Sequence, residues 1–333
     1  MASARPTIYD VARLAGVSTA TVSRALNGTG QIAAGTRRTI EAAVEQLGYR
    51  PNTIARSLVT KSTQTIALLL PEITNPFYAQ LVGGIQKAAL AARHTMLLCT
   101  TEGDPTREEQ YLSLLRSKQV DGALVDGLVL PNHRIARVAE GFPIVCLDRD
   151  IDSPSVPLVQ VDNRRGAYLA TQHLLSLGHT RIAHVAGVRD LRISEQRVAG
   201  YRDALAAAGL PADPGLVATG SFTEEGGYTA MQSLLDSGAT AVFAANDLSA
   251  LGAMHALSAS GRRVPGDVSV VGFDDVRLAA FTSPPLTTVR QPAREIGERA
   301  TRLLLELTKG RTIAQPVHLL EPQLVVRGST APP

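Results

Sequence analysis

The sequence lacks the features of several protein classes. It has no tryptophan, 4% aromatic residues and two cysteines among 333 residues. Its longest apolar runs, such as TIALLL at Thr65–Leu70, are far too short to cross a bilayer. The opening residues MASARPTIYD lack the apolar core of a secretory signal, so we expect a cytoplasmic protein. Cys99 and Cys146 lie in strand-like runs, which favours buried, reduced thiols over a disulfide.

Motifs for catalysis and cofactor binding are also missing from the sequence. No Gly-x-Gly-x-x-Gly follows the first strand-like run, which argues against a dinucleotide-binding enzyme. The loop GTGQIAAG at 28–35 follows a helical pattern and lacks a Lys-Ser/Thr ending, so it is not a phosphate loop. His173, His179 and His184 lack metal-ligand spacing, and Ser194 has no visible histidine partner. We therefore predict no enzymatic activity, no metal and no cofactor.

The charge of the chain is unevenly distributed. Residues 1–64 carry eight Lys or Arg and three Asp or Glu, although the whole chain has a net charge of only +3. All of the positive excess therefore lies in the first fifth of the sequence. This asymmetry indicates an N-terminal module that faces a polyanion, although a solvated basic surface would give the same distribution.

Three short helical patterns occupy the first fifty residues. Thr7 and Asp10 form a capping signal for the first helix, and Gly16 ends it. Ser18 is positioned to cap the second helix, which ends at Asn27. A third helix is predicted to begin at Thr36, to bury Ile40, Val44 and Leu47, and to close at Gly48. Three helices with a tight turn between the first two predict a helix-turn-helix domain.

The second of these helices, VSTATVSRALNG at 17–28, has an unusual composition. In a helix-turn-helix, this helix lies in the DNA major groove with its N-terminal end foremost. Thr19 and Ala20 are small enough to approach base edges, and Arg24 lies one turn after Ala20, where it can contact guanine. An ordinary surface helix with a solvated arginine is the alternative. The caps, the turn and the charge asymmetry together favour DNA binding.

These residues carry a specific resemblance. The stretches YDVARLAGVSTATVSRALNG and LGYRPNTIARSL are similar to the DNA-binding headpiece of the lactose repressor (LacI/GalR) family of bacterial transcription regulators. The resemblance implies that Pro51 stops the third helix and that Asn52 caps a short hinge helix. In the family, two hinge helices of a dimer pair over the operator centre, where Ala55 would permit close approach and Leu58 would enter the minor groove.

A hinge of about seven residues is too short to be a stable helix alone, so we expect it to order only on DNA. A plain linker helix is the alternative for this segment. The resemblance implies the following DNA-binding residues: Thr7, Tyr9, Ser18, Thr19, Ala20, Thr21, Ser23, Arg24, Asn27, Asn52, Ala55, Arg56 and Leu58.

From residue 65 onward, strand-like and helical patterns alternate. Strand-like runs such as GALVDG, RIAHVAG and VSVVGFDD are separated by amphipathic segments such as 77–92, 108–118, 166–177, 197–208 and 228–235. Alternation of this kind predicts parallel sheets with crossover helices. About ten strands are too many for one compact sheet, and a break falls near VQVDNRRG at 159–166. We therefore expect an α/β fold with two subdomains and a cleft between them.

The resemblance extends over essentially the whole chain. EQRVAGYRDAL, AANDLSALGAM, VSVVGFDD and PPLTTVRQP are similar to the family's effector-binding core, which is related in fold to periplasmic sugar-binding proteins. This implies a helix-turn-helix headpiece at 1–50, a hinge and linker at 51–64, and a core at 65–333 with two Rossmann-like subdomains. The expected N-subdomain spans 65–161 and 291–320, and the expected C-subdomain spans 162–290 and 321–333.

Polar residues at strand ends are the candidates for effector binding, because ligands of open α/β sheets bind there. The resemblance implies these effector-binding residues: Phe77, Tyr78, Asp148, Arg197, Phe222, Asn246, Asp274 and Gln291. Arginine, aspartate and asparagine suit the hydroxyl groups of a sugar, and an aromatic face can cover its C–H side. Alternatively, Asn246 and Asp274 are helix caps or loop turns and Phe222 is core. Arg192 and Ser194 are weaker candidates.

Together these features predict a sequence-specific DNA-binding regulator, most simply a repressor. It would bind a palindromic operator as a homodimer, with a small effector, expected to be a sugar, in the cleft and no membrane association. The C-terminal VVRGSTAPP lacks leucine heptads, which favours a dimer over a tetramer. Alternatives are a transport-type sugar-binding protein without a DNA role, an α/β enzyme, or a regulator that responds to a nucleobase, nucleoside or sugar phosphate.

Overall fold

The computed structural model describes residues 6–27, 30–50, 62–117, 119–127, 129–148, 153 and 156–333. The chain forms two compact units, Met1–Thr63 and Gln64–Pro333, which we call the headpiece and the core. Each unit is considered by itself. None of the helices in this described part of the chain is long and apolar enough to cross a membrane.

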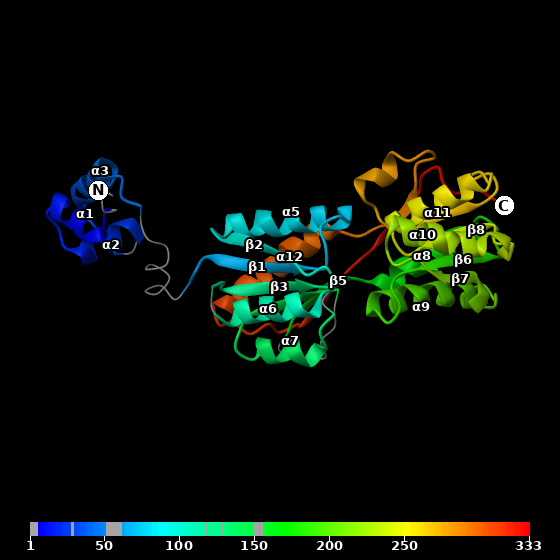
Figure 1. Ribbon diagram of the computed structural model, residues 1–333, viewed down its shortest axis with the longest axis horizontal. Coiled ribbons are helices and arrows are strands. Elements are labelled where there is room, and N and C mark those ends of the chain that lie inside the picture. Colours follow the sequence, from blue (N-terminus) through cyan, green and yellow to red (C-terminus); the bar gives the residue numbers. More distant parts are fainter. Residues whose placement is uncertain are drawn as a thin grey trace. The chain divides into compact units, whose positions relative to one another are not determined.

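The headpiece consists of α1 (Ile8–Ala15), α2 (Thr19–Asn27) and α3 (Ala34–Leu47) (Figure 1). The backbone N–H and the hydroxyl of Thr7 donate to the Asp10 carboxylate at 2.9 and 2.7 Å, which confirms the predicted cap. Gly16 ends α1 in the left-handed conformation with φ 65°, a backbone geometry that suits glycine. The Ser18 hydroxyl accepts a hydrogen bond from the Thr21 N–H at 3.2 Å.

The predicted start of the third helix is wrong by two residues. We expected Thr36 to open α3, but the helix begins at Ala34 and its N-cap residue is Ala33. The Ala33 carbonyl already accepts from the Arg37 N–H at 3.0 Å, so the backbone closes the first turn without a side-chain cap. Among the described residues of the headpiece, the hydrophobic core contains six buried residues: Val11, Ala12, Val22, Ala25, Ile40 and Ala43.

The first sheet of the core has six parallel strands in the order β11-β5-β4-β3-β1-β2. These are β1 (Thr65–Leu70), β2 (Thr95–Thr100), β3 (Gly122–Asp126), β4 (Ile144–Leu147), β5 (Leu158–Val161) and β11 (Val317–Leu320). Its helices are α5 (Pro76–Ala91), α6 (Pro105–Arg116), α7 (Asn132–Ala139) and α12 (Ala293–Thr308). Alternate residues of β1 enter two different hydrophobic clusters, so this strand is buried on both faces.

The second sheet has six strands in the order β12-β10-β9-β8-β6-β7, of which only β12 pairs antiparallel. These are β6 (Ile182–Ala186), β7 (Val217–Thr219), β8 (Ala241–Ala244), β9 (Ser269–Asp274), β10 (Thr287–Arg290) and β12 (Gln323–Val325). Its α-helices are α8 (Asn163–Ser176), α9 (Arg192–Ala207), α10 (Glu224–Leu234) and α11 (Asp247–Ala259). Short 3₁₀ helices occur at Pro214–Leu216, Leu235–Ser237 and Arg277–Ala280. The two sheets confirm the predicted fold class.

The chain passes three times between the two α/β subdomains. It crosses between β5 and α8, between β10 and α12, and between β11 and β12 (Figure 1). The first crossing lies within the stretch 159–166, where the sequence shows a break. Because the chain connects the subdomains only at these three crossings, a change in the angle between them requires backbone rotation in these few segments.

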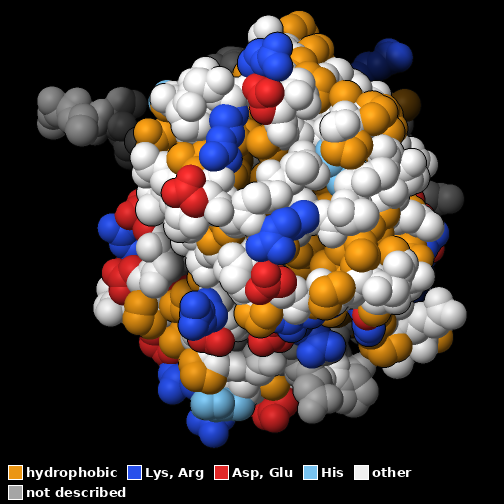
Figure 2. All heavy atoms as spheres, turned by 90° about the vertical axis from the view of Figure 1, so that its right-hand side faces the viewer, with side chains coloured by type: hydrophobic (Ala, Val, Ile, Leu, Met, Phe, Trp, Pro, Cys, Tyr) orange, Lys and Arg blue, Asp and Glu red, His pale blue; other side chains and the backbone are white. Residues whose placement is uncertain are grey.

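The charge on the core surface differs from that of the headpiece sequence. On the face seen in Figure 2, acidic and basic side chains are interspersed with apolar ones. Such a mixed surface is typical of a solvated protein face rather than of a polyanion-binding stripe. Cys99 and Cys146 are buried and neither forms a disulfide, as the sequence predicts.

Candidate functional site

The predicted DNA-reading residues lie on the outer side of α2. Ala20 and Arg24 are exposed and one turn apart, whereas Val22 and Ala25 on the opposite side are buried. Thr19, Thr21 and Ser23 are half-buried between these two sides. The helix is therefore held by a narrow apolar stripe and leaves a face of small side chains and one arginine open to solvent.

Two of the predicted DNA contacts also have local structural roles. Thr7 closes the cap of α1, and the Ser18 hydroxyl lies 2.9 Å from that of Thr21. Tyr9 is 69% exposed on α1. Asn27 is the last residue of α2, and its side chain lies outside the described residues, as do Asn52, Ala55, Arg56 and Leu58.

In the core, the structure brings most of the predicted effector residues around one buried arginine. Arg197 on α9 is 3% exposed. Its Nε donates to Asn163 Oδ1 at 2.9 Å, and its Nη1 donates to the Ala245 carbonyl. The same Nη1 lies 3.9 Å from Asp274 Oδ1, at the end of β9. A buried guanidinium requires such partners, because an unpaired buried charge is costly.

Aromatic rings cover the Arg197 guanidinium. Its central carbon lies 3.8 Å from the centroid of Phe273 and 5.6 Å from that of Phe222. Tyr78 packs edge-on against Phe77 with 5.4 Å between ring centroids, and Phe77 itself is 7% exposed in the hydrophobic core. The ring faces that can contact a ligand therefore belong to Tyr78 and Phe222, which are both half-buried.

Two carboxylates share the field of Arg197. Burial raises the pKa of Asp274 to about 6, although Arg197 and the Gln291 amide oppose this shift. The Gln291 Nε2 donates to Asp274 Oδ1 at 2.6 Å. Burial also raises the pKa of Asp148 to about 6, against the attraction of Arg197 and a hydrogen bond from Asn163. Asp148 directly follows β4 in the first sheet, so the two carboxylates come from different subdomains.

Asn246 acts as a helix cap, which was the alternative interpretation of this residue. Its side-chain oxygen accepts from the Ser249 N–H at 2.9 Å, and its amide donates to the Phe222 carbonyl at 2.9 Å. Phe222 itself has a left-handed backbone with φ 63°. Asn246 therefore positions the loop that presents the Phe222 ring.

Sequence reasoning missed two residues of this cluster, Asn163 and Phe273. A signal for each was present, because Asn163 follows β5 at the predicted break and Phe273 precedes Asp274 in VSVVGFDD. Among the described residues, no group of three His, Cys, Asp or Glu side chains could hold a metal ion.

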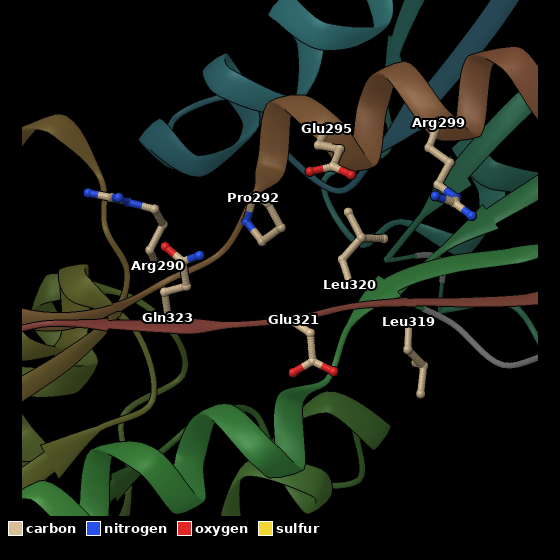
Figure 3. A pocket seen from close by; sticks show the side chains of 8 residues that line it. All are labelled: Arg290, Pro292, Glu295, Arg299, Leu319, Leu320, Glu321 and Gln323. Carbon is tan, nitrogen blue, oxygen red and sulfur yellow. The ribbon is translucent and has the colours of Figure 1, made fainter.

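A shallow pocket of about 360 Å³ lies beside two of the crossing segments (Figure 3). In the figure, Glu295 and Arg299 project from α12 toward the segment that contains Leu320, the last residue of β11, and Glu321. The pocket is lined by Arg290, Pro292, Glu295, Arg299, Leu319, Leu320, Glu321 and Gln323. Its walls combine residues of α12 and β11 with residues at two of the crossing segments.

Comparison with known proteins assigns the family. The model described as bacterial regulatory proteins, lacI family, matches residues 7–52, and the model of a periplasmic binding protein-like domain matches residues 171–330. The HTH-type transcriptional regulator DegA of Bacillus subtilis (strain 168) is 39% identical, covering 98% of this chain and 99% of its own. The chain belongs to the LacI family.

Other relatives of this LacI-family chain agree in length and fold. The ribose operon repressor of Escherichia coli (strain K12) is 39% identical over 97% of this chain and 99% of its own. A solved Lac repressor dimer bound to operator and the anti-inducer ONPF is 30% identical, with a TM-score of 0.87 over 98% of this chain and 99% of that one. A complex of the transcriptional regulator CelR with cellobiose is 39% identical, with a TM-score of 0.76 over 98% of this chain and 100% of that one.

The family assignment excludes two of the alternatives left open by the sequence, the transport-type sugar-binding protein without a DNA role and the α/β enzyme. The LacI-family chain is a DNA-binding transcriptional regulator and not an enzyme. Its headpiece is the DNA-binding part, and its core is of the periplasmic-binding-protein type.

Proposed function

We propose that this regulator is a cytoplasmic repressor that binds a near-palindromic operator as a homodimer and releases it when a sugar occupies the cleft of the core. The observation that carries the proposal is the exposed face of α2, where Ala20 and Arg24 lie opposite the buried Val22 and Ala25. The Lac repressor dimer on its operator supports the dimeric arrangement.

The headpiece would read each operator half-site with α2. Thr19 and Ala20 lie at the N-terminal end of the helix, which enters the major groove first in a helix-turn-helix. Arg24 can make a bidentate contact to guanine, while methyl groups of Thr19 and Ala20 suit thymine. The headpiece would be held in position on the phosphates and neighbouring bases by the remaining predicted contacts, Thr7, Tyr9, Ser18, Thr21, Ser23 and Asn27.

The hinge would couple the two units. The proposed hinge residues Asn52, Ala55, Arg56 and Leu58 lie outside the described residues. Leu58 from each subunit would enter the minor groove at the operator centre and bend the duplex. Pairing of two hinge helices requires their attachment points on the core to be a fixed distance apart.

The effector would bind at the cluster around Arg197. The guanidinium can donate hydrogen bonds to sugar hydroxyls, and the carboxylates of Asp148 and Asp274 can accept them. The side chains of Tyr78 and Phe222 can cover the sugar ring. Relatives whose names include ribose and cellobiose favour a sugar. Asp148 and Arg197 lie in different subdomains, so a ligand bound between them favours one inter-subdomain angle. A coupling of about 1–3 kcal/mol suffices for a roughly 5- to 150-fold change in operator affinity.

The experiment that tests this function is duplex selection by the full-length protein, followed by substitution of Arg24. We expect selection to yield a near-palindrome, and Arg24→Ala to weaken its binding by about 10- to 100-fold, because a bidentate base contact is lost. The control is Arg13→Ala, which removes an 80% exposed cation from α1 of the same domain and should weaken binding to all duplexes slightly and equally. Failure to prefer any palindrome over random duplex at moderate salt would refute the function.

A further inference from the structure

The point at which the chain enters the core is held by a side chain from a neighbouring strand. Gln64 is the first residue of the core and directly precedes β1. Its backbone N–H donates to Asp121 Oδ2 at 2.9 Å, and Asp121 directly precedes β3. The Gln64 carbonyl accepts from the N–H of Thr95, the first residue of β2, at 2.8 Å. Both polar groups of the Gln64 backbone are therefore bonded to residues at the start of the two strands that flank β1.

Asp121 contacts the beginning of β1 twice. While its carboxylate accepts from Gln64, its own N–H donates to the Thr65 carbonyl at 2.7 Å. The Asp121 side chain is only 11% exposed, and shielding from water strengthens a hydrogen bond to a charged acceptor. The contact lies at the amino ends of the strands, which is the edge of the sheet opposite to the candidate effector residue Asp148. Asp121 therefore belongs to a site separate from the proposed effector site.

The backbone conformation of Gln64 gives a second, independent indication. Its φ is 52°, in the left-handed region that residues with a side chain seldom adopt. Such a conformation persists where the surrounding contacts fix it. Gln64 is exposed, so burial of its side chain contributes little to this restraint. The hydrogen bonds to Asp121 and Thr95 are the contacts that can hold the chain in this direction.

His94 supports the Asp121 carboxylate from the side of β2. Its Nδ1 lies 2.8 Å from the Ala92 carbonyl, which can only accept, so Nδ1 carries a proton and donates. This bond orients the ring, and Nε2 then lies 3.8 Å from Asp121 Oδ2. The ring packs beside the carboxylate and limits how far it can turn away from Gln64. Three segments that lead into neighbouring strands thus meet at the entry point of the chain.

We infer that Asp121 is a positioning residue for operator binding, because by holding Gln64 it fixes the direction in which the chain leaves the core toward the headpiece. The inference rests on the proposed function, in which the hinge couples the two units. Without this restraint, the chain before β1 would sample more directions, and a dimer that engages two half-sites would have to order it. A random duplex offers no pair of half-sites, so its binding does not require this ordering. Loss of the restraint should therefore weaken operator binding selectively.

Two substitutions of Asp121 in the full-length protein test the inference. Asp121→Ala removes the acceptor, whereas the amide oxygen of Asp121→Asn can still accept from the Gln64 N–H. For the palindrome selected by the wild type, we expect Asp121→Ala to bind about 10-fold more weakly, the cost of ordering one backbone residue. We expect Asp121→Asn to stay within about 3-fold of the wild type, because the acceptor is kept. Affinity for a random duplex should not change, and hydrogen exchange of the Gln64 amide should be faster only in Asp121→Ala.

Substitutions of Gln64 change the other partner and leave Asp121 intact. Gln64→Pro removes the N–H and excludes a φ of 52°, so it should weaken operator binding by at least about 10-fold. Gln64→Asn keeps the N–H, and asparagine adopts the left-handed conformation readily, so its operator affinity should equal that of the wild type. This pair tests the restraint even if Asp121→Ala does not fold.

The matched control is Asp104→Ala in the same subdomain. Asp104 Oδ1 also accepts one backbone N–H, that of Thr106 at 2.8 Å, but at the start of α6, so its loss should leave operator affinity unchanged. Wild-type operator affinity in Asp121→Ala or Gln64→Pro would overturn the inference. An equal loss in Asp104→Ala, or in Asp121→Asn, would also overturn it, because destabilisation or charge would then be the cause. If the wild type selects no palindrome, the proposed function itself fails, and this is seen before any variant is measured.

Discussion

The headpiece and the core differ in how exposed their proposed binding residues are. In the headpiece, Arg24 and Ala20 lie on the exposed side of a helix whose buried side contains Val22 and Ala25. In the core, Arg197 is 3% exposed and bonded to its neighbours before any ligand arrives. DNA is a large polyanion that can cover an exposed face, whereas a small effector must be enclosed to lose its water.

In the headpiece, a side chain can therefore contribute to binding without contributing to stability. In the core, one and the same side chain contributes to both. A side chain that only meets DNA adds little to the folded headpiece, so its loss should leave folding unchanged. A side chain that holds buried carboxylates and a loop carbonyl contributes to both ligand binding and folding. Substitutions of the two arginines therefore test the comparison directly.

The largest effect is expected for Arg197→Ala. It leaves the Asp274 carboxylate and the Asn163 amide oxygen buried without their cationic partner, which should lower the free energy of unfolding of the core by about 3–5 kcal/mol. Arg24→Ala should change the free energy of unfolding of the headpiece by less than about 0.5 kcal/mol. Because the chain has no tryptophan, urea denaturation is best followed by far-ultraviolet circular dichroism. The control is Arg202→Ala, an exposed arginine on the same helix, and a loss below about 1 kcal/mol for Arg197→Ala would contradict the comparison.

The pH dependence of stability should also have opposite signs in the two regions. Burial raises the pKa of Asp274 from 3.8 to about 6. A raised carboxyl pKa means that the folded core binds the proton more tightly than the unfolded chain. The stabilisation of the core by this protonated carboxyl is therefore complete below pH 4 and is lost as the pH rises through 6. For one carboxyl, the loss of stability is about 3 kcal/mol. It can be measured as the difference between the free energies of unfolding of wild type and Asp274→Asn across pH 4–7.

In the headpiece, the sign is reversed. Hydrogen bonds from Thr7 and the nearby Arg13 lower the pKa of Asp10, so its contribution is present above pH 4 and is lost as the pH falls. Asp10→Asn should therefore weaken the headpiece at neutral pH, and this loss of stability should shrink as the pH falls below 4. Hydrogen exchange of the α1 amides, measured on the full chain, follows this region separately. If the stabilities of the headpiece and the core changed with pH in the same direction, the predicted difference between the two regions would be wrong.

Local chemistry explains which elements could be predicted from the sequence. The cap at Thr7 and Asp10 and the glycine stop at Gly16 depend only on neighbouring residues, and both were predicted correctly. The start of α3 was not, because Ala33 and Ala34 carry no capping group and the backbone alone closes the turn. Leu14 follows the helical period but is 45% exposed, since periodicity does not show how far a small core extends.

The candidate site was only partly predictable for a different reason. Resemblance to the family supplied Arg197 and Asp274, whose side chains the structure brings within 3.9 Å of each other. The stacking of Phe273 on Arg197 and the hydrogen bond from Arg197 to Asn163 join residues far apart in the sequence. Such contacts depend on the packing of α9 against α8 and β6, which no local pattern encodes.

The smallest expected effect compares the same methyl deletion in each region. Ile40 in α3 and Ile66 in β1 are both fully buried, and Ile→Val should cost each region about 1 kcal/mol. A small domain has a small unfolding entropy, so Ile40→Val should lower the melting temperature of the headpiece by about 4–8 °C, against about 2–4 °C for Ile66→Val in the core. Calorimetry of the full chain measures both transitions. Equal shifts in melting temperature would mean that the headpiece does not unfold as a separate unit. The proposed DNA-contacting residues of α2 would then unfold together with the core.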